Sequence, residues 1–543
     1  MTGSNHHRDV ELLPGTEILL HPNENNVLVE SDKELELIPA PSDDPSDPLN
    51  WSPKWKAIVI VNQAIFVFTS VLTPFSITPL TPIFIETFHI DIPQVNLLFG
   101  AVAIALGYAN LVLVPFANVF GRRFVVFLCG FICFMANIWQ ALVTSYPSFI
   151  GARVLSGLGA AANESLMPMI VCDLMFLHQR GLWMGVYFCT YWTGLFIGPI
   201  ISGSIASHVS WRWFFWFCTI LQGANFIAMV FFAPETRFRR GRSHPGTPTG
   251  VTTTLDSDKE KQEVTTTTDD SRSKTPSISA SQPHTVNNVL GTGKPSKAQF
   301  ALIPTLQYDG LSLLLHDITA PIYIFTFPII LWASLSFGFS ANCLLSLNLT
   351  QSQVFAAPPY NFSPASVGFI NFAFFGGSLI GLLTAGPLSD WISMRATRRN
   401  GGIREPEMRL ITLIPYIVIC LIGMVVTGVG YQRQWPWEAI IIIGYGFIGI
   451  EIVGIPTIVI AYAVDCYKHI SGEIMVTATI AKNTYGFGMI FFFNNWTISS
   501  GYIKPMMTSM AQCVGITTVG MLIFMRWGKN FRRMTRDSKL HNL

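Results

Sequence analysis

Four ionisable side chains lie inside long apolar stretches of this sequence: Arg153, Glu164, Glu451 and Lys482. A charged group in the apolar core of a bilayer is costly, so each of these residues is a candidate functional residue. Arg153 and Glu164 are eleven residues apart, which on one helix places both side chains on the same face, about 16 Å apart along the axis. That separation excludes a direct pair. We expect either a polar path along this face or separate ion pairs with other helices.

Glu451 lies near the middle of a glycine-rich apolar stretch, residues 444–456 (GYGFIGIEIVGIP). Glycine and proline make a helix irregular, and irregular helices with a polar group at mid-membrane are typical of binding sites in membrane carriers. A carboxyl in this setting can take up and release a proton, neutralise a cationic ligand or form a structural pair. The sequence leaves these three roles open.

Lys482 begins the polar patch KNTYGFG, residues 482–488. Its long side chain can reach the inner membrane surface, and this is the simplest interpretation. Alternatively, Lys482 lines an internal cavity together with Asn342, Tyr191 and Trp192. The aromatic rings would offer apolar contact and, for a cation, attraction to the ring face.

The stretch GLFIGPIISG, residues 194–203, combines three glycines with a proline. Pro199 removes a backbone donor, while Gly194, Gly198 and Gly203 leave part of the helix surface without side chains. Such a helix can bend and can pack closely against a moving neighbour. The alternative is a kinked helix with a packing role only.

Composition indicates a membrane protein. Half of the residues are hydrophobic and only 12% are charged, whereas soluble domains contain about 25% charged residues. The net charge of +2 gives no bulk attraction to nucleic acid. The nine cysteines are scattered singly, so we expect small buried hydrophobic side chains rather than disulfides or metal ligands.

Apolar runs of about twenty residues, long enough to cross a bilayer as helices, occur six times in each half of the chain. They are residues 57–79, 94–116, 123–143, 147–171, 181–206, 212–233, 320–346, 365–387, 410–430, 438–463, 474–498 and 505–526. The fourth and tenth runs are counterparts, so Glu164 and Glu451 should face one central cavity from opposite halves.

The predicted runs divide the chain into five parts. A tract rich in Ser, Thr and Pro separates the halves, and it has too few large apolar residues to build a core. The parts are a disordered tail (1–56), a six-helix half (57–233), a largely disordered linker (234–318), a second six-helix half (319–526) and a C-terminal tail (527–543).

Lysine and arginine are concentrated in the loops on the side of the N-terminus, among them Arg122, Arg123 and Arg180. The positive-inside rule therefore predicts that both termini and the linker are cytoplasmic. On this topology two glycosylation sequons, at Asn348 and Asn361, fall in the one sizeable outer loop.

Several motifs resemble those of the major facilitator superfamily. Residues 194–203 are similar to the antiporter signature on the fifth helix of these transporters, whose core is Gly-xxx-Gly-Pro. The turn after the second run keeps Gly121, Arg122 and Arg123 of the family turn, with Asn118 where Asp is usual, which implies a weaker charge lock. Arg153 lies in an Arg-xxx-Gly-x-Gly motif associated with proton-coupled members, and Asp390 is the acid of the equivalent second-half turn, GPLSDW.

Shorter segments narrow the resemblance to fungal drug:proton antiporters with twelve spans, close to the group of a yeast polyamine and cation carrier. These segments are DPLNW (47–51), PET (234–236), EPEMRL (405–410) and YAVDCY (462–467). The resemblance implies an all-α membrane protein of the major facilitator fold, with twelve transmembrane helices in two halves. It implies a monomeric transporter rather than an enzyme, without cofactor or metal.

The expected activity is proton-coupled export of a small organic molecule, a drug or secondary metabolite, across the plasma membrane by alternating access. Arg153, Glu164 and Glu451 are the candidates for proton coupling. The alternative is proton-coupled uptake of polyamine-like or other cationic nutrients. No phosphate-binding loop GxxxxGK[ST] occurs, so the sequence does not support ATP as the energy source.

Overall fold

The computed structural model describes residues 46–238, 293–301, 310–467 and 470–535, together with residues 16–18, 20–22, 28–30, 42, 44 and 291. The disorder expected for the N-terminal tail and the linker concerns mainly residues outside this set, including 239–290. The end of the C-terminal tail, 536–543, also lies outside the described residues.

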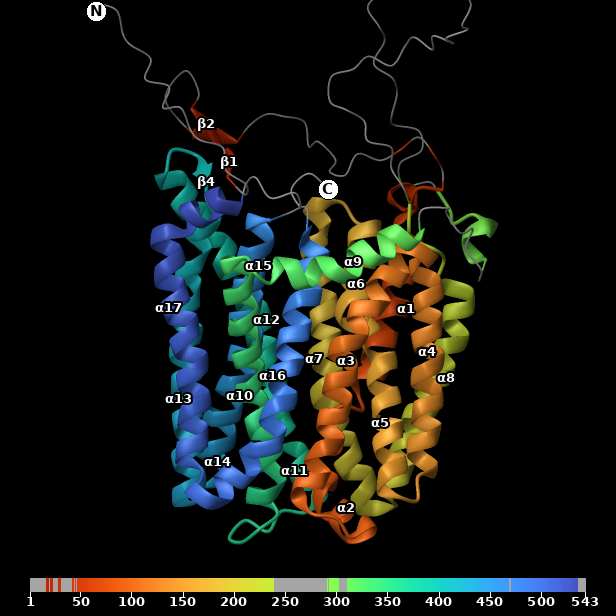
Figure 1. Cartoon of the computed structure of the whole chain (residues 1–543), viewed down its shortest axis with the longest axis vertical. Coiled ribbons are helices and arrows are strands. Elements are labelled where there is room, and N and C mark those ends of the chain that lie inside the picture. The colour runs from red at the N-terminus through yellow and green to blue at the C-terminus, as the bar shows by residue number, and fades with distance from the viewer. Residues whose placement is uncertain are drawn as a thin grey trace, which may run out of the picture.

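The first half of the chain forms a bundle of helices that we call the N-terminal half (Figure 1). Its helices are α1 (Pro53–Val71), α2 (Thr81–Phe88), α3 (Ile92–Phe120), α4 (Arg122–Leu142), α5 (Tyr146–Ala160), α6 (Ala162–Leu174), α7 (Leu177–His208) and α8 (Trp211–Phe232), with 3-10 turns η1 (Pro48–Asn50) and η2 (Thr78–Leu80).

The second bundle, the C-terminal half, lies beside the first (Figure 1). It comprises α9 (Gly310–Ile324), α10 (Pro328–Phe355), α11 (Pro364–Phe369), α12 (Asn371–Arg399), η5 (Pro406–Thr412), α13 (Leu413–Arg433), α14 (Trp437–Ala439), the π-helical segment η6 (Ile440–Tyr445), α15 (Gly446–Cys466), α16 (Ser471–Ser500) and α17 (Ile503–Thr535). The described residues also include η4 (Lys297–Phe300) and the short strands β1 (Glu17–Ile18), β2 (Leu20–Pro22), β3 (Leu28–Glu30) and β4 (Ile403–Arg404), paired as β1–β4 and β2–β3.

Eleven helical segments of the described chain are long and apolar enough to cross a membrane. The thirty-residue helix α16 is not among them, because polar residues such as Lys482, Asn483 and Asn494 interrupt its apolar sequence. It nevertheless runs through the bundle alongside the other long helices (Figure 1). With α16 the arrangement agrees with the expected twelve helices in two halves.

Several expected runs have different ends in the structure. The eighth and twelfth extend to Arg399 and Thr535, so the predicted start of the C-terminal tail at residue 527 is wrong. The first was expected to reach residue 79, but α1 ends at Val71, because prolines at 74 and 79 cannot continue a regular helix. The seventh was expected to begin at residue 320, but α9 and α10 are separate helices with Pro328 at the start of the second. The linker expected to extend to residue 318 therefore ends earlier, since α9 begins at Gly310.

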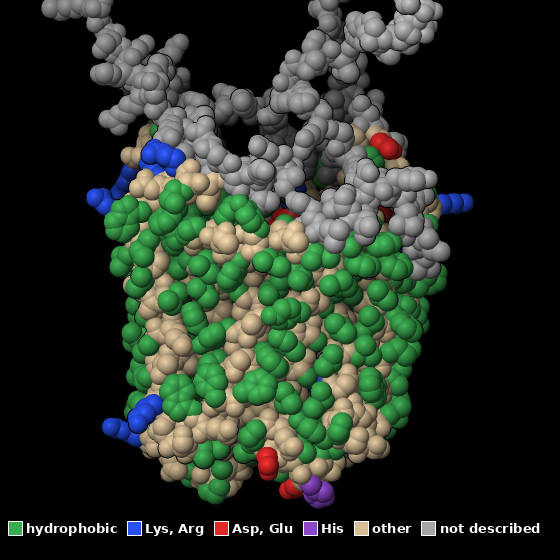
Figure 2. Space-filling view, viewed as in Figure 1, with side chains coloured by type: hydrophobic (Ala, Val, Ile, Leu, Met, Phe, Trp, Pro, Cys, Tyr) green, Lys and Arg blue, Asp and Glu red, His purple; other side chains and the backbone are tan. Residues whose placement is uncertain are grey.

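The helix α9 lies across one end of the bundle, whereas α2 and α11 lie at the opposite end (Figure 1). We name these the α9 end and the α2 end. Hydrophobic side chains cover the middle of the molecule, and the lysines and arginines in view lie near its two ends (Figure 2). Exposed Leu182, Leu383 and Ile498 belong to this apolar surface, which suits a protein surrounded by lipid.

Candidate functional site

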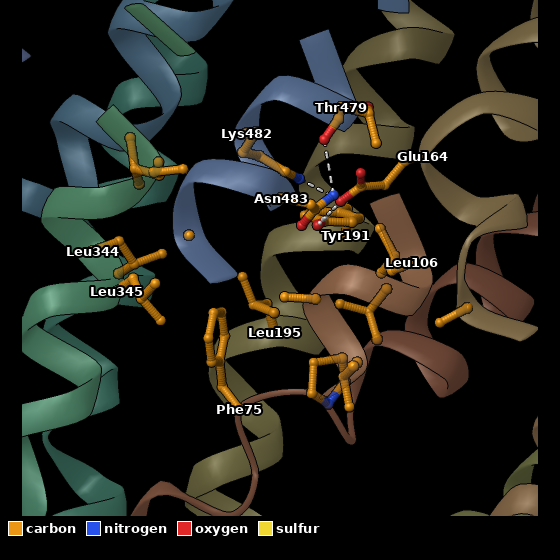
Figure 3. A pocket seen from close by; sticks show the side chains of 18 of the residues that line it. Phe75, Leu106, Glu164, Tyr191, Leu195, Leu344, Leu345, Thr479, Lys482 and Asn483 are labelled. Carbon is orange, nitrogen blue, oxygen red and sulfur yellow. Dashed lines mark hydrogen bonds and ion pairs between the residues drawn. The ribbon is translucent and has the colours of Figure 1, made fainter. Parts of the chain in front are cut away.

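A cavity lies between the two halves, bordered by α3, α6 and α7 on one side and by α10 and α16 on the other. Its lining is mostly aliphatic and aromatic (Figure 3). The apolar residues that line it include Phe75, Leu106, Leu195, Leu344 and Leu345. Apolar contact therefore dominates the surface that is offered to a bound molecule.

An ion pair joins the halves across this cavity. Lys482 Nζ of α16 lies 2.5 Å from Glu164 Oε1 of α6, and the Tyr191 hydroxyl of α7 donates to the same oxygen at 2.9 Å. Both charged side chains are largely shielded, with 14% exposure for Lys482 and 7% for Glu164. The ammonium also lies 5.2 Å from the centre of the Phe337 ring, a cation–π distance. Figure 3 shows Glu164, Tyr191 and Lys482 meeting at one point.

The cavity lining carries no net charge. Glu164 and Lys482 are the two formally charged side chains among the described residues that line it, and they neutralise each other. Glu164 Oε2 is buried and has no hydrogen-bond partner among the described residues. One carboxylate oxygen is therefore left to accept a proton or a donor from a ligand.

The structure brings together the residues expected at a cavity. Tyr191, Trp192, Asn342 and Lys482 all line it, and Asn342 Nδ2 also donates to Ser509 Oγ at 3.2 Å. The interpretation of Lys482 as reaching the membrane surface is wrong, because its ammonium turns inward to Glu164. Electrostatic attraction and the shielding of both groups account for that orientation.

Glu451 does not share the cavity with Glu164, so the expectation that both face it is wrong for Glu451. Its side chain has 0% exposure and lies inside the C-terminal half, where the Cys513 thiol donates to Oε1 at 3.5 Å. The next residue, Ile452, lines the cavity. The face of α15 that meets the cavity is therefore apolar, and the carboxylate lies behind it.

Arg153 is also fully buried and is held by backbone carbonyls. Its guanidinium donates to the oxygens of Thr73 at 2.9 Å, Pro74 at 2.7 Å and Leu98 at 3.2 Å, and to Gln140 Oε1 at 3.3 Å. These contacts fasten the chain after α1 to α3, α4 and α5. Arg153 is not among the described residues that line the cavity, so the polar path expected along its face does not join it to Glu164.

The glycines of α7 lie where backbones approach each other. A Cβ atom on Gly194 would lie 2.9 Å from the Phe68 carbonyl oxygen, and one on Gly198 would lie 2.1 Å from that of Leu72. On Gly203 it would lie 2.4 Å from the Pro364 carbonyl oxygen of the other half. Pro199 is inside α7. Its carbonyl oxygen would in turn lie 2.7 Å from a Cβ on Gly368, so the halves meet backbone to backbone at the α2 end.

The turn between α3 and α4 is held by two acidic residues from elsewhere in the chain. Gly121 has φ of 98°, a conformation that glycine adopts most readily, and the Glu235 carboxylate accepts from the backbone amides of Arg122 at 2.9 Å and Arg123 at 3.1 Å. Arg122 Nε lies 3.2 Å from Asp173 Oδ2. A carboxylate at the start of a helix stabilises it through the exposed amides and the helix dipole.

The asparagine of this turn links the halves. Asn118 Oδ1 accepts from Arg122 Nη1 at 2.9 Å, and its Nδ2 donates to Asp317 Oδ2 of α9 at 2.8 Å. An aspartate here could accept the first bond but could not donate the second. With asparagine at this position, a hydrogen bond from Asn118 to Asp317 of the C-terminal half takes the place of part of the ion-pair network that an aspartate would form.

The equivalent turn of the C-terminal half is built around an arginine. Asp390 Oδ1 lies 3.1 Å from Arg409 Nη2, and Arg409 Nε lies 3.3 Å from Asp465 Oδ2. Arg404 reaches the same Asp465 oxygen at 3.7 Å. Asp390 is 68% exposed, so its pair is weak compared with a buried one.

The two sequons have different positions. Asn348 was expected in an outer loop, and this position is wrong: it is buried inside α10 with 2% exposure and donates to the Leu344 carbonyl at 3.1 Å. The helix continues to Phe355, beyond the expected run. Asn361 is exposed in the loop between α10 and α11, and its glycosylation stays a prediction.

Sequence analysis missed Asp173, Asp317, Glu235 and Phe337 as contributors to these sites. Glu235 lies in the PET segment, which was noted only as a family motif, although an acidic residue after a span is a signal for capping a neighbouring turn. The roles of Asp173 and Asp317 depend on contacts between distant segments, and no local spacing indicates them.

Comparison with known proteins agrees with this architecture. Residues 64–492 match the family model described as Major Facilitator Superfamily. The chain is 28% identical to an uncharacterized MFS-type transporter of Schizosaccharomyces pombe, over 97% of this chain and 94% of the relative. It is 28% identical to the protein HOL1 of Saccharomyces cerevisiae, over 97% and 96%.

A third relative, the efflux pump radE of Floropilus chiversii, is 25% identical over 82% of this chain and 75% of its own length. Among solved structures, the proton:xylose symporter XylE superposes with a TM-score of 0.55 at 12% identity, over 88% of this chain and 96% of that one. At 12% identity, the similarity to the XylE structure concerns the fold alone.

Proposed function

Because this chain belongs to the major facilitator superfamily, we propose that it is a proton-coupled exporter of small, largely apolar organic molecules. The observation that carries the proposal is the ion pair between Glu164 and Lys482, which joins the two halves at the wall of the cavity. A group that couples proton movement to a change of access must carry an ionisable side chain and contact both halves. Glu164 of the N-terminal half carries a carboxyl, and this carboxyl contacts Lys482 of the C-terminal half.

In the proposed cycle, protonation of Glu164 breaks its ion pair with Lys482. With Glu164 ionised, its attraction to Lys482 and the Tyr191 hydrogen bond hold α6, α7 and α16 together. A proton on Glu164 removes the charge of the carboxylate, and the Lys482 ammonium is then left shielded from water without a counter-charge, which is strongly unfavourable. The ammonium is then free for solvent or substrate, and the bundle can change its opening.

The lining of the cavity favours the binding of neutral or amphipathic substrates over the binding of polyamines. Aromatic and aliphatic side chains supply most of the contact surface, and the one carboxylate is already neutralised by Lys482. A polycation would have to displace that ammonium and would find no second acid among the described lining residues. The polyamine-uptake alternative therefore has no particular observation in its favour.

Two observations favour export as the direction of transport. Among the relatives, the chain resembles one named an efflux pump, and its lysines and arginines cluster in the loops of the α9 end. We assign that end, with both termini, to the cytoplasm and the protein to the plasma membrane. The backbone contacts of Gly203 and Gly368 at the α2 end would then seal the outer side in this conformation.

The glycine-rich face of α7 and the two inner turns complete the proposal. Close backbone contact lets helices slide without side-chain barriers, so Gly194, Gly198 and Gly203 would allow α7 to move against α1 and α11. Arg122 and Asp390, with the residues around them, would hold the inner ends of the helices in register. One chain contains both halves and the cavity, and the proposal therefore needs only a monomer.

The test uses liposomes that contain the purified protein and a pH-sensitive dye. A panel of neutral aromatic compounds is added under a membrane potential clamp, with spermidine as the polycation. We expect neutral aromatic compounds to trigger proton movement with the parent protein and not with Glu164→Gln. Spermidine as the best trigger, or equal proton movement by both proteins, would contradict the proposal.

A further inference from the structure

Three buried cysteines and one buried glutamate meet inside the C-terminal half. Cys343 of α10, Cys420 of α13 and Cys513 of α17 have their sulfur atoms within 4.8 Å of one another. The Cys513 thiol donates to Glu451 Oε1 of α15 at 3.5 Å. Three helices therefore bring one sulfur atom each to the same place, and the Glu451 carboxyl of a fourth helix lies beside this group in contact with Cys513.

The surroundings of this cluster are dry, and the carboxylate is incompletely satisfied. All four side chains have 0% exposure. Glu451 Oε2 has no hydrogen bond of regular geometry among the described residues, although the Ser340 side chain interacts with this carboxyl. A buried carboxylate oxygen without a partner costs free energy unless another group compensates it. A cation bound between the carboxylate and the sulfur atoms would do so.

From this geometry we propose that Cys343, Cys420, Cys513 and Glu451 form a binding site for a thiophilic d10 metal ion, Zn²⁺ or Cu⁺. Three sulfur ligands and one oxygen ligand match the number and types that tetrahedral zinc uses, and soft sulfur ligands also select Cu⁺. Sulfur atoms about 2.3 Å from a tetrahedral ion lie about 3.8 Å apart. The sulfur atoms lie within 4.8 Å of one another, so the cluster would have to contract by up to about 1 Å to reach that spacing.

Metal coordination changes the protonation of this cluster. A cysteine binds Zn²⁺ or Cu⁺ as a thiolate, so each coordinating thiol releases its proton to water. Three thiolates and the Glu451 carboxylate around Zn²⁺ give a net charge of −2, and three thiolates beside a protonated Glu451 give the same net charge with Cu⁺. The metal–ligand bonds must therefore outweigh the free-energy cost of a residual charge in a low-dielectric interior.

The cluster lies next to the cavity described above. Cys343 stands between Asn342 and Leu344, and Ile452 follows Glu451; these three neighbours line the cavity. The site therefore lies directly behind the cavity wall, and a bound ion would tie α10 and α15 to α13 and α17. The inference concerns metal binding alone and does not depend on the proposed transport function.

The experiment measures metal on purified full-length protein in detergent. All samples carry serine at the half-exposed Cys172 and Cys189, so that accessible thiols do not contribute. Equilibrium dialysis against Zn²⁺, and separately against Cu⁺ with ascorbate, is followed by elemental analysis. We expect one ion per chain, loss of that ion in Cys420→Ser, and retention in Cys218→Ser, a buried cysteine of the other half.

If Cys420→Ser does not fold, X-ray absorption spectroscopy of the metal-loaded parent protein tests the proposal, because it identifies the atoms bound to the ion. Three sulfur neighbours at about 2.3 Å support the site, with one additional oxygen for zinc and none required for copper. Metal binding that is equal in the Cys420 and Cys218 variants, or a bound ion with fewer than two sulfur neighbours, would overturn it.

Discussion

The two halves use their equivalent spans in different ways. Glu164 of the fourth span meets the cavity and is paired with a lysine of the other half, whereas Glu451 of the tenth span is enclosed by its own half and contacts a thiol. The two backbones hold corresponding places, but the neighbours that the two carboxylates meet are unrelated. The matching order of spans in the two halves therefore predicts that both spans carry a buried carboxyl. It does not predict which role each carboxyl has.

The difference also separates two kinds of buried charge. An ion pair between the halves would break or rearrange if the halves moved relative to each other. The free energy of that pair would then be part of the cost of the conformational change. A carboxylate among groups of one half can stay in place throughout. On this argument Glu164 is the better candidate for coupling, and Glu451 belongs with the internal structure of the C-terminal half.

The largest expected effect comes from Glu164→Gln compared with Glu451→Gln. The first removes the carboxylate partner of Lys482, so we expect loss of proton-driven transport and a destabilisation of about 3–5 kcal/mol from the unpaired ammonium. The second should reduce transport by less than about tenfold, a difference of 1.4 kcal/mol in a barrier. Transport in liposomes under an imposed pH gradient and thermal unfolding measure both.

A double variant separates pairing from coupling. Glu164→Gln with Lys482→Met replaces both charges by uncharged side chains of similar size, so stability should recover while proton-driven transport stays lost. Recovery of coupled transport in the double variant, or a greater loss in Glu451→Gln than in Glu164→Gln, would reverse the assignment of the two carboxylates.

Sequence patterns predicted the number of spans, the two halves and some of the residues that line the cavity, among them Glu164, Tyr191 and Asn342, because apolar length and the cost of buried charge are local properties. They did not predict the partner of Lys482, since a pair 318 residues apart in the chain depends on how α6 and α16 pack. The sequence also did not predict that Cys343, Cys420 and Cys513 lie close together, because they are far apart in the chain and their separations follow no regular pattern. Asn348 was misplaced because the helix extends beyond its most apolar part.

The second comparison concerns the fifth and eleventh spans, α7 and α16. A methyl group on Gly198 would meet the Leu72 carbonyl oxygen at 2.1 Å, while nothing lies within 4 Å of one on Gly488. Gly198→Ala should therefore displace α1 from α7, cost about 1–3 kcal/mol by overpacking and impair transport. Gly488→Ala should leave stability equal or raise it by up to about 1 kcal/mol through helix propensity.

Melting temperature and initial transport rates of the two glycine variants test this expectation. The two substitutions add the same methyl group to helices of equivalent position, so their difference isolates the backbone contact. Similar behaviour of both proteins would mean that the motif in residues 194–203 has no special packing role.

A smaller effect is expected at the two inner turns. Asn118→Asp replaces the amide that donates to Asp317 by a second carboxylate, so repulsion should loosen α9 from α3 at a cost of about 1 kcal/mol. Asp390→Asn should change stability by less than about 1 kcal/mol, because its pair is exposed and Arg409 keeps Asp465.

Hydrogen exchange of the α9 amides measures the first change, and thermal unfolding measures the second. Combining Asn118→Asp with Asp317→Asn restores one donor and one acceptor and should return exchange toward the parent rate. Unchanged exchange in Asn118→Asp would show that the hydrogen bond between the halves does not hold α9.

The smallest effect on the protein itself is expected at the outer connections. In the N-terminal half the chain after the first span folds back into η2 and α2, whereas the corresponding connection of the C-terminal half leaves an exposed loop with Asn361. Oligosaccharyl transfer needs an accessible sequon, and Asn348 is buried with its amide bonded to Leu344. Asn361→Gln should therefore abolish any glycosidase-sensitive shift in gel mobility, with transport unchanged, and Asn348→Gln should leave the shift intact. A shift that disappears with Asn348→Gln instead would mean that this part of α10 is open when the chain is modified.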